Sequence, residues 1–243
     1  MKRIELLKVP HDKKVGDKVA PLPANITEDT LFIEDGEIIG FYINDMAKYS
    51  KKACKLADIA DNELRSKRVP KSEMSRGPQG NKADKLKREQ EGKQLVTQYS
   101  VILGGVGPKP HMRRNYPTVS MKLIMPKQYE IQKQLIEDNS PKKYRFCDLF
   151  TSSISNFNIS ADYHIDRANI KGCCNVIIAK RMSSTGGNTT VPDYDATFDS
   201  ADNSMLVYPA WRNLHGVTPI ETKDGGYRNT LVFYPLASFA KFK

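Results

Sequence analysis

The sequence has few cysteines and no long apolar run. Its four cysteines form no C-x-x-C pair, which argues against a zinc ribbon, a redox dithiol or a disulfide scaffold. No window approaches the roughly 18 apolar residues that a membrane-spanning helix requires. The charged N-terminus, residues 1–18, lacks the apolar core of a secretory signal. We therefore expect a soluble, intracellular protein of the cytoplasm or nucleus of a host, with no membrane association and no obligate protein partner.

Positive charge is in excess and is concentrated in one segment. The chain has 38 Lys and Arg against 28 Asp and Glu, a net charge of +10 with a pI near 9.3, which points toward a polyanionic partner. Residues 65–93 hold ten basic and four acidic residues, and several Pro and Gly residues there predict a long loop followed by a short charged helix. This segment is either a solvated surface loop or an arm that neutralises phosphates. The candidate DNA-binding residues are Lys82, Lys85, Lys87, Arg88, Arg113 and Arg114.

The pattern of apolar residues predicts a mainly β protein with flanking helices. Helices are expected over residues 45–64, where apolar residues recur near i, i+3 and i+4, and over residues 126–139. From Leu95 onward, short runs rich in Val, Ile, Thr and Tyr alternate with turn-forming clusters, which is typical of a β-sandwich or barrel. The expected strands are residues 96–103, 118–124, 175–179, 204–208 and 229–234. We expect one compact unit, in which an N-terminal helical and basic extension (residues 1–94) packs on a β core (residues 95–243).

The strongest local signal is His164-Ile-Asp166. On a strand, residues i and i+2 point to the same face, so an imidazole and a carboxylate there would offer two ligands to one metal ion. A third ligand is available in His215. Arg228 follows it at the start of an expected strand, and its planar guanidinium suits bidentate binding of a carboxylate. His-x-Asp, a distant His and then an Arg is the order found in non-haem iron oxygenases that consume 2-oxoglutarate.

The sequence around these residues resembles that of the TET/JBP family. This family comprises the ten-eleven translocation 5-methylcytosine oxidases and the J-binding-protein thymine hydroxylases. The resemblance covers roughly residues 98–236. It rests on His-x-Asp-x-x-Asn, His-Gly-Val and Arg-x-[Ser/Thr]-Leu-Val-Phe-Tyr, which occur here in the family's order. It implies a double-stranded β-helix (jelly-roll) core, with Fe(II) as cofactor and 2-oxoglutarate and O2 as co-substrates. The implied partner is DNA with a 5-methylpyrimidine flipped out of the duplex.

The resemblance also implies a role for single residues. The implied catalytic residues and iron ligands are His164, Asp166 and His215. Arg228 would bind the distal carboxylate of 2-oxoglutarate, with support from the hydroxyl of Thr230. Asn169 matches a residue that hydrogen-bonds the target base, and Tyr234 matches an aromatic residue that stacks on it. The alternative for Asn169 is a turn after the strand, and for Tyr234 it is packing in the core.

One position departs from the family's pattern. Animal TET enzymes place a His two residues after the Phe-Tyr pair, where this chain has Leu236, and they carry a cysteine-rich region that this chain lacks. The chain resembles a compact viral or microbial member. The expected function is a 2-oxoglutarate- and Fe(II)-dependent dioxygenase that hydroxylates the 5-methyl group of 5-methylcytosine in DNA. The alternatives are thymine hydroxylation in DNA, oxidation of a protein or small molecule, and a non-catalytic DNA-binding module.

Overall fold

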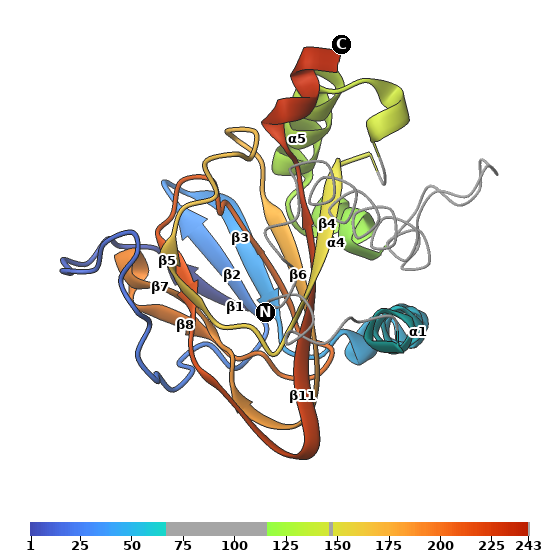
Figure 1. Cartoon of the computed structure of the whole chain (residues 1–243). Coiled ribbons are helices and arrows are strands. Elements are labelled where there is room, and N and C mark those ends of the chain that lie inside the picture. The colour runs from blue at the N-terminus through green and yellow to red at the C-terminus, as the bar shows by residue number, and fades with distance from the viewer. Residues whose placement is uncertain (67–115, 146–147, 243) are drawn as a thin grey trace, which may run out of the picture.

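The computed structural model describes residues 1–66, 116–145 and 148–242 (Figure 1). The expected strand over residues 96–103 and the boundary near residue 94 lie outside the described residues. The same holds for all six candidate DNA-binding residues, namely Lys82, Lys85, Lys87, Arg88, Arg113 and Arg114.

Two β-sheets form the framework, and the prediction of a mainly β protein is confirmed. The larger sheet has the strand order β1-β2-β3-β9-β6-β11-β4, and the smaller has the order β5-β10-β7-β8. The strands of the larger sheet are β1 (Lys2–Glu5), β2 (Thr30–Glu34), β3 (Glu37–Ile43), β9 (Met205–Tyr208), β6 (Asn175–Gly186), β11 (Ile220–Tyr234) and β4 (Ser152–Phe157). Those of the smaller sheet are β5 (Ala161–His164), β10 (His215–Val217), β7 (Thr189–Val191) and β8 (Ala196–Phe198).

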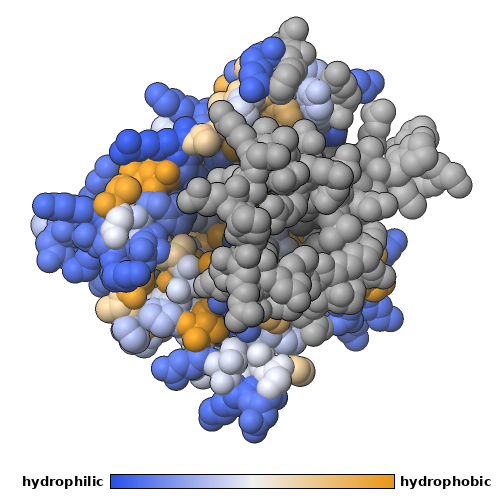
Figure 2. Space-filling view, viewed as in Figure 1, coloured by the Kyte–Doolittle hydropathy of each residue, from blue (hydrophilic) through white to orange (hydrophobic). Residues whose placement is uncertain are grey.

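Helices cover one face of the larger sheet, and the smaller sheet lies against the other face (Figure 1). The helices are η1 (Met46–Lys48), α1 (Lys51–Ser66), α4 (Tyr116–Ile124), α5 (Pro126–Asn139), η3 (Lys142–Tyr144), η4 (Pro192–Tyr194) and η5 (Ala237–Phe242). None of the helices in the described part of the chain combines the length and apolar character needed to cross a membrane. In the view of Figure 2, hydrophilic residues dominate much of the visible described surface.

The alternation of side chains along each strand separates two interiors. In β11, Leu231 and Phe233 belong to the core between the larger sheet and the helices. Their neighbours Thr230 and Val232 instead line the space on the opposite face. Because successive residues of a strand point to opposite faces, a single strand both closes the core and supplies side chains to the cavity between the sheets.

The N-terminal part of the chain adds strands to the larger sheet. β2 and β3 form a hairpin whose turn residues, Asp35 and Gly36, both have positive φ, as a tight two-residue hairpin turn requires. β3 then pairs with β9 in the middle of the sheet. The irregular segment between β1 and β2 is also fixed, because Val19 packs with Tyr163 and Leu214 beside the smaller sheet.

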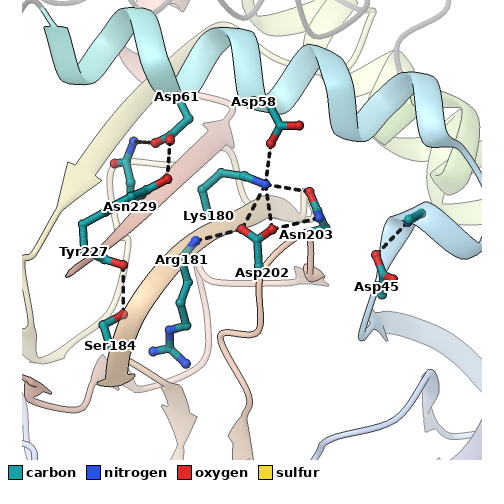
Figure 3. A network of polar contacts seen from close by, with 11 residues as sticks. Asp45, Asp58, Asp61, Lys180, Arg181, Ser184, Asp202, Asn203, Tyr227 and Asn229 are labelled. Carbon is teal, nitrogen blue, oxygen red and sulfur yellow. Dashed lines mark hydrogen bonds and ion pairs between the residues drawn. The ribbon is translucent and has the colours of Figure 1, made fainter. Parts of the chain in front are cut away.

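A polar network holds α1 on the helix-covered face of the sheet (Figure 3). Asp61 accepts hydrogen bonds from the amide of Asn229 at 2.7 Å and from the hydroxyl of Tyr227 at 3.0 Å. One helical turn earlier, Asp58 forms an ion pair at 2.7 Å with Lys180 of β6. Lys180 and Asn229 point away from the cavity, so this network positions the sheet and contributes nothing to the space between the sheets.

Two expectations about secondary structure are wrong in detail. Residues 118–124 were expected as a strand because of their β-branched and apolar content, but they form helix α4. Pro117, Met121 and Met125 are all buried at four-residue spacing, so burial of one helical face outweighs local β propensity. The expected helix over residues 45–64 is divided, because Asp45 caps η1 and α1 begins only at Lys51.

The other expected elements are confirmed. Helix α5 covers the predicted residues 126–139. The strands expected over residues 175–179 and 229–234 are parts of β6 and β11, and the strand expected over residues 204–208 corresponds to β9. β6 and β11 are longer than predicted, since they continue as a paired ribbon beyond the apolar runs.

Candidate metal centre and anion site

His164, Asp166 and His215 meet at one end of the smaller sheet. His164 is the last residue of β5, His215 is the first residue of β10, and the two are directly paired across these antiparallel strands. Their ring centroids are 4.2 Å apart. One ligand atom from each of the three residues lies within 4.8 Å of the others. Strand pairing therefore brings together His164 and His215, which are 51 residues apart in the sequence, and Asp166 completes the predicted triad.

Asp166 reaches this centre from a loop and not from the strand. β5 ends at His164, so the expectation that both side chains project from one strand is wrong. The backbone N–H of Asp166 instead donates to the carbonyl of Ala210 at 3.1 Å, which fixes the loop. Its carboxylate Oδ1 lies 3.7 Å from Nε2 of His164.

Both imidazoles are oriented by backbone carbonyls. Nδ1 of His164 lies 2.7 Å from the carbonyl oxygen of Asp162, and Nδ1 of His215 lies 2.9 Å from that of Asn213. A carbonyl can only accept, so each Nδ1 carries the proton and each Nε2 presents a lone pair. Burial, together with the nearby ring of His164, lowers the pKa of His215, which favours the neutral form that binds metal ions.

This donor set fits a divalent transition metal. Two imidazole nitrogens and one carboxylate oxygen form the ligand set of the facial triad, which leaves coordination positions open and is typical of non-haem Fe(II) oxygenases. Among the described residues, this is the group of histidine, cysteine and acidic side chains whose ligand atoms converge in this way. The predicted ligands are thus compatible with binding of Fe(II).

Arg228 lies buried on β11 with an incomplete set of partners. It is 2% exposed. Its guanidinium donates to the hydroxyl of Ser200 at 3.0 Å and, weakly, to that of Thr230 at 3.5 Å, while its Nε has no partner. No carboxylate of the described residues forms an ion pair with it. Burial first, and then the charge of Arg181, lower the pKa of Arg228 to about 9.

An unpaired buried cation is costly unless an anion compensates it. Arg228 is therefore suited to bind a carboxylate from a ligand, and the orphaned Nε offers a donor for it. Gly187 leaves the room this needs, because a Cβ at that position would lie 3.1 Å from Nε of Arg228. These observations fit the distal carboxylate of 2-oxoglutarate.

A cavity of about 380 Å³ connects the metal centre and Arg228. Its lining contains all seven residues that the sequence assigned to the site: His164, Asp166, Asn169, His215, Arg228, Thr230 and Tyr234. Leu236 also lies in the wall, together with apolar residues of β4, β6 and β11. The structure thus brings the residues predicted to bind metal, co-substrate and base into the lining of one cavity.

Among the lining residues for which the sequence predicted no role are two asparagines and a tyrosine. Asn175 begins β6, Asn156 lies on β4 opposite Thr230, and Tyr208 ends β9 with its ring edge-on to His215 at 5.3 Å. Asn175 and Tyr208 each lie beside a core residue of their strand, Val176 and Val207, so the alternation of side chains along a strand could have indicated that they face the cavity. Ser200, which orders Arg228, lies in a loop and carried no such signal.

Comparison with solved structures confirms the expected double-stranded β-helix (jelly-roll) fold. One similar structure is NgTET1 in complex with 5mC DNA, with a TM-score of 0.54 and 12% sequence identity over 93% of this chain and 83% of that chain. No protein-family model and no curated protein matches the sequence. At this identity the likeness establishes a TET-like fold and leaves the reaction to be argued from the site.

Proposed function

We propose that this chain is a 2-oxoglutarate- and Fe(II)-dependent dioxygenase that hydroxylates the 5-methyl group of 5-methylcytosine in DNA. The observation that carries the proposal is that a His-Asp-His ligand set and a buried arginine without a counter-ion share one cavity. The TET-like fold supports the same class of reaction. Neither a metal site alone nor a buried arginine alone would indicate this chemistry.

The residues divide into three roles in this proposal. His164, Asp166 and His215 would hold Fe(II). Arg228 would bind the distal carboxylate of 2-oxoglutarate, and Thr230 would orient the guanidinium from the same face of β11. When bound, the metal and co-substrate supply the oxidising chemistry that a methyl C–H bond requires, because that bond is too weakly acidic for acid–base catalysis.

The chain's own residues would orient the substrate and shield the reaction from water. Tyr234, the last residue of β11, and Leu236, two residues beyond it, lie in the cavity wall. The segment that follows the ligand Asp166 is pinned beside them, because the N–H of Ile170 donates to Pro235 and that of Ala237 donates to Ala168. A flat base inserted into the cavity would therefore meet an aromatic ring and an apolar side chain close to the metal ligands.

DNA is the proposed partner because of charge and fold. The chain carries a net charge of +10, and a flipped base must leave a duplex whose phosphates need neutralising. Lys82, Lys85, Lys87 and Arg88 remain our candidates for those contacts. Replacing these four with Gln should weaken binding to all duplexes and flatten its salt dependence. An unchanged salt slope would remove them from the proposal.

Thymine in DNA is the second candidate substrate, because one observation removes a contact that would select cytosine. Leu236 lies in the cavity wall and has no group that hydrogen-bonds the exocyclic amino group of cytosine. Thymine and 5-methylcytosine carry the same 5-methyl group, so an apolar wall would accept either.

Formation of succinate from 2-oxoglutarate tests the proposed reaction class. We expect purified protein with Fe(II) to form succinate faster when methylated duplex DNA is added, and we expect Asp166→Ala and His164→Ala to abolish this. Unmethylated duplex of the same sequence and a denatured sample are the controls. Succinate formation that survives Asp166→Ala would contradict the proposal.

A further inference from the structure

The carboxylate of Asp166 is held by a chain of two asparagines. Nδ2 of Asn175 donates to Oδ2 of Asp166 at 2.8 Å, and Nδ2 of Asn169 donates to Oδ1 of Asn175 at 2.9 Å. Nδ2 of Asn169 also lies 3.4 Å from the same Oδ2. The other carboxylate oxygen, Oδ1, faces His164. One oxygen of the acid is thus occupied by amides, and the other points to the metal centre.

Chemistry alone dictates the direction of these bonds. An ionised carboxylate only accepts hydrogen bonds, so Asn175 must present its NH2 group to Asp166. Its carbonyl oxygen is then directed to Asn169, which must in turn present its own NH2 group. Asn175 is 2% exposed and Asn169 is 5% exposed, so water does not readily replace either bond. The chain therefore has one consistent arrangement.

We infer that Asn175 is a positioning residue that keeps Asp166 bound to the metal through Oδ1 alone. The inference rests on the proposed metal site. Turning the carboxylate to chelate through both oxygens would distort the hydrogen bond from Asn175 to Oδ2, so this bond favours coordination through Oδ1 and a coordination position stays free. Partners of this kind that orient a ligating carboxylate contribute to metal affinity as well as to geometry.

The same arrangement restricts what Asn169 does. Its NH2 group is committed to Asn175 and Asp166, so only its carbonyl oxygen remains to contact a substrate. Asn169 would therefore accept a hydrogen bond from the target base, from the amino group of cytosine or from N3–H of thymine. A base contact and the orientation of the metal ligand then depend on one side chain.

Titration of the metal-free protein with Co(II), followed by its visible absorption, tests the inference without turnover. Asn175→Leu removes the donor at similar volume, and Asn175→Ser removes it while leaving room for water if the leucine variant does not fold. Asn229→Leu is the matched control, because Asn229 is also buried and also donates to a carboxylate, Asp61 at 2.7 Å, but on the far face of the sheet. Asp166→Ala reports whether binding uses the triad.

We expect both Asn175 variants to weaken Co(II) binding by about 10- to 100-fold and to change the shape of the absorption band. Asn229→Leu should lower the melting temperature but leave affinity and band unchanged. Wild-type affinity and spectrum in both Asn175 variants would overturn this inference and leave the proposed function standing. Equal weakening by Asn229→Leu would also overturn it, since the effect would then be general loosening. Binding that Asp166→Ala does not reduce would overturn the proposed function and this inference together.

Discussion

Arg228 lies directly opposite Arg181, one on β11 and the other on β6, so the buried guanidinium of Arg228 and the half-buried one of Arg181 share a face of the sheet. Arg181 has a nearby counter-ion in Asp199, at 3.7 Å, whereas Arg228 has none among the described residues. Two like charges on facing positions destabilise a sheet. The pair therefore leaves a net positive charge at the end of the cavity, which an anionic ligand would neutralise.

Arg228→Met should separate the binding of co-substrate from the folding of the chain. We expect the KM for 2-oxoglutarate to rise roughly 100-fold, about 2.8 kcal/mol, because the loss of one partner from a buried charge pair costs 2–5 kcal/mol. The ligand-free variant should be at least as stable as the wild type, because an uncompensated buried charge is removed. Thermal unfolding with and without 2-oxoglutarate measures both effects. Equal stabilisation of both proteins by 2-oxoglutarate would contradict the assignment of Arg228.

Gly187→Ala should impair the same site by crowding it. Gly187 has φ +67°, and a Cβ there would lie 3.1 Å from Nε of Arg228. Gly225 has φ +71° with open space around it, so Gly225→Ala carries the same backbone strain, about 1–2 kcal/mol, without the crowding. We expect both variants to lose stability and only Gly187→Ala to raise the KM for 2-oxoglutarate, by roughly tenfold. Indistinguishable KM values for the two variants would show that binding of 2-oxoglutarate does not depend on the space that Gly187 leaves beside Arg228.

The sequence predicted the site better than its surroundings. His164, Asp166, His215 and Arg228, which the structure brings into one cavity, could be singled out because the proposed metal and carboxylate binding would restrict residue type and order, whatever the surrounding contacts. Asn175 and Ser200 could not, because their roles depend on which strands and loops become neighbours. Likewise α4 was mistaken for a strand, since its β-branched residues masked a four-residue spacing of buried side chains that only the packed helix makes evident.

Tyr234 should contribute to substrate binding through its ring. Stacking of a base on an aromatic side chain is worth about 1–3 kcal/mol, so Tyr234→Ala should lower kcat/KM on methylated DNA by about 10- to 100-fold. Tyr234→Phe keeps the ring and should lose far less. Steady-state kinetics with a short methylated duplex compares the variants, with the KM for 2-oxoglutarate as an internal control. Equal losses in the two variants would assign the effect to the hydroxyl and not to stacking.

Two acids of α1 should differ sharply in their contribution to stability. Asp61 is 1% exposed and accepts from Asn229 and Tyr227, so Asp61→Ala should cost about 2–4 kcal/mol. The side chain of Asp58 is 52% exposed and its partner Lys180 also pairs with Asp202, so Asp58→Ala should cost less than about 1 kcal/mol. Urea unfolding measures both. A larger cost for Asp58→Ala would contradict the account of how α1 is held.

The central claim is tested most directly by identifying the product base. Duplex DNA containing 5-methylcytosine is incubated with the protein, Fe(II), 2-oxoglutarate and O2, digested to nucleosides and analysed by mass spectrometry, with Asp166→Ala in parallel. We predict 5-hydroxymethylcytosine, or its further oxidised forms, in the wild-type sample alone. 5-Hydroxymethyluracil from thymine would transfer the claim to the second substrate. Unmodified DNA in the presence of active, metal-loaded protein would contradict the claim that this cavity oxidises a DNA base.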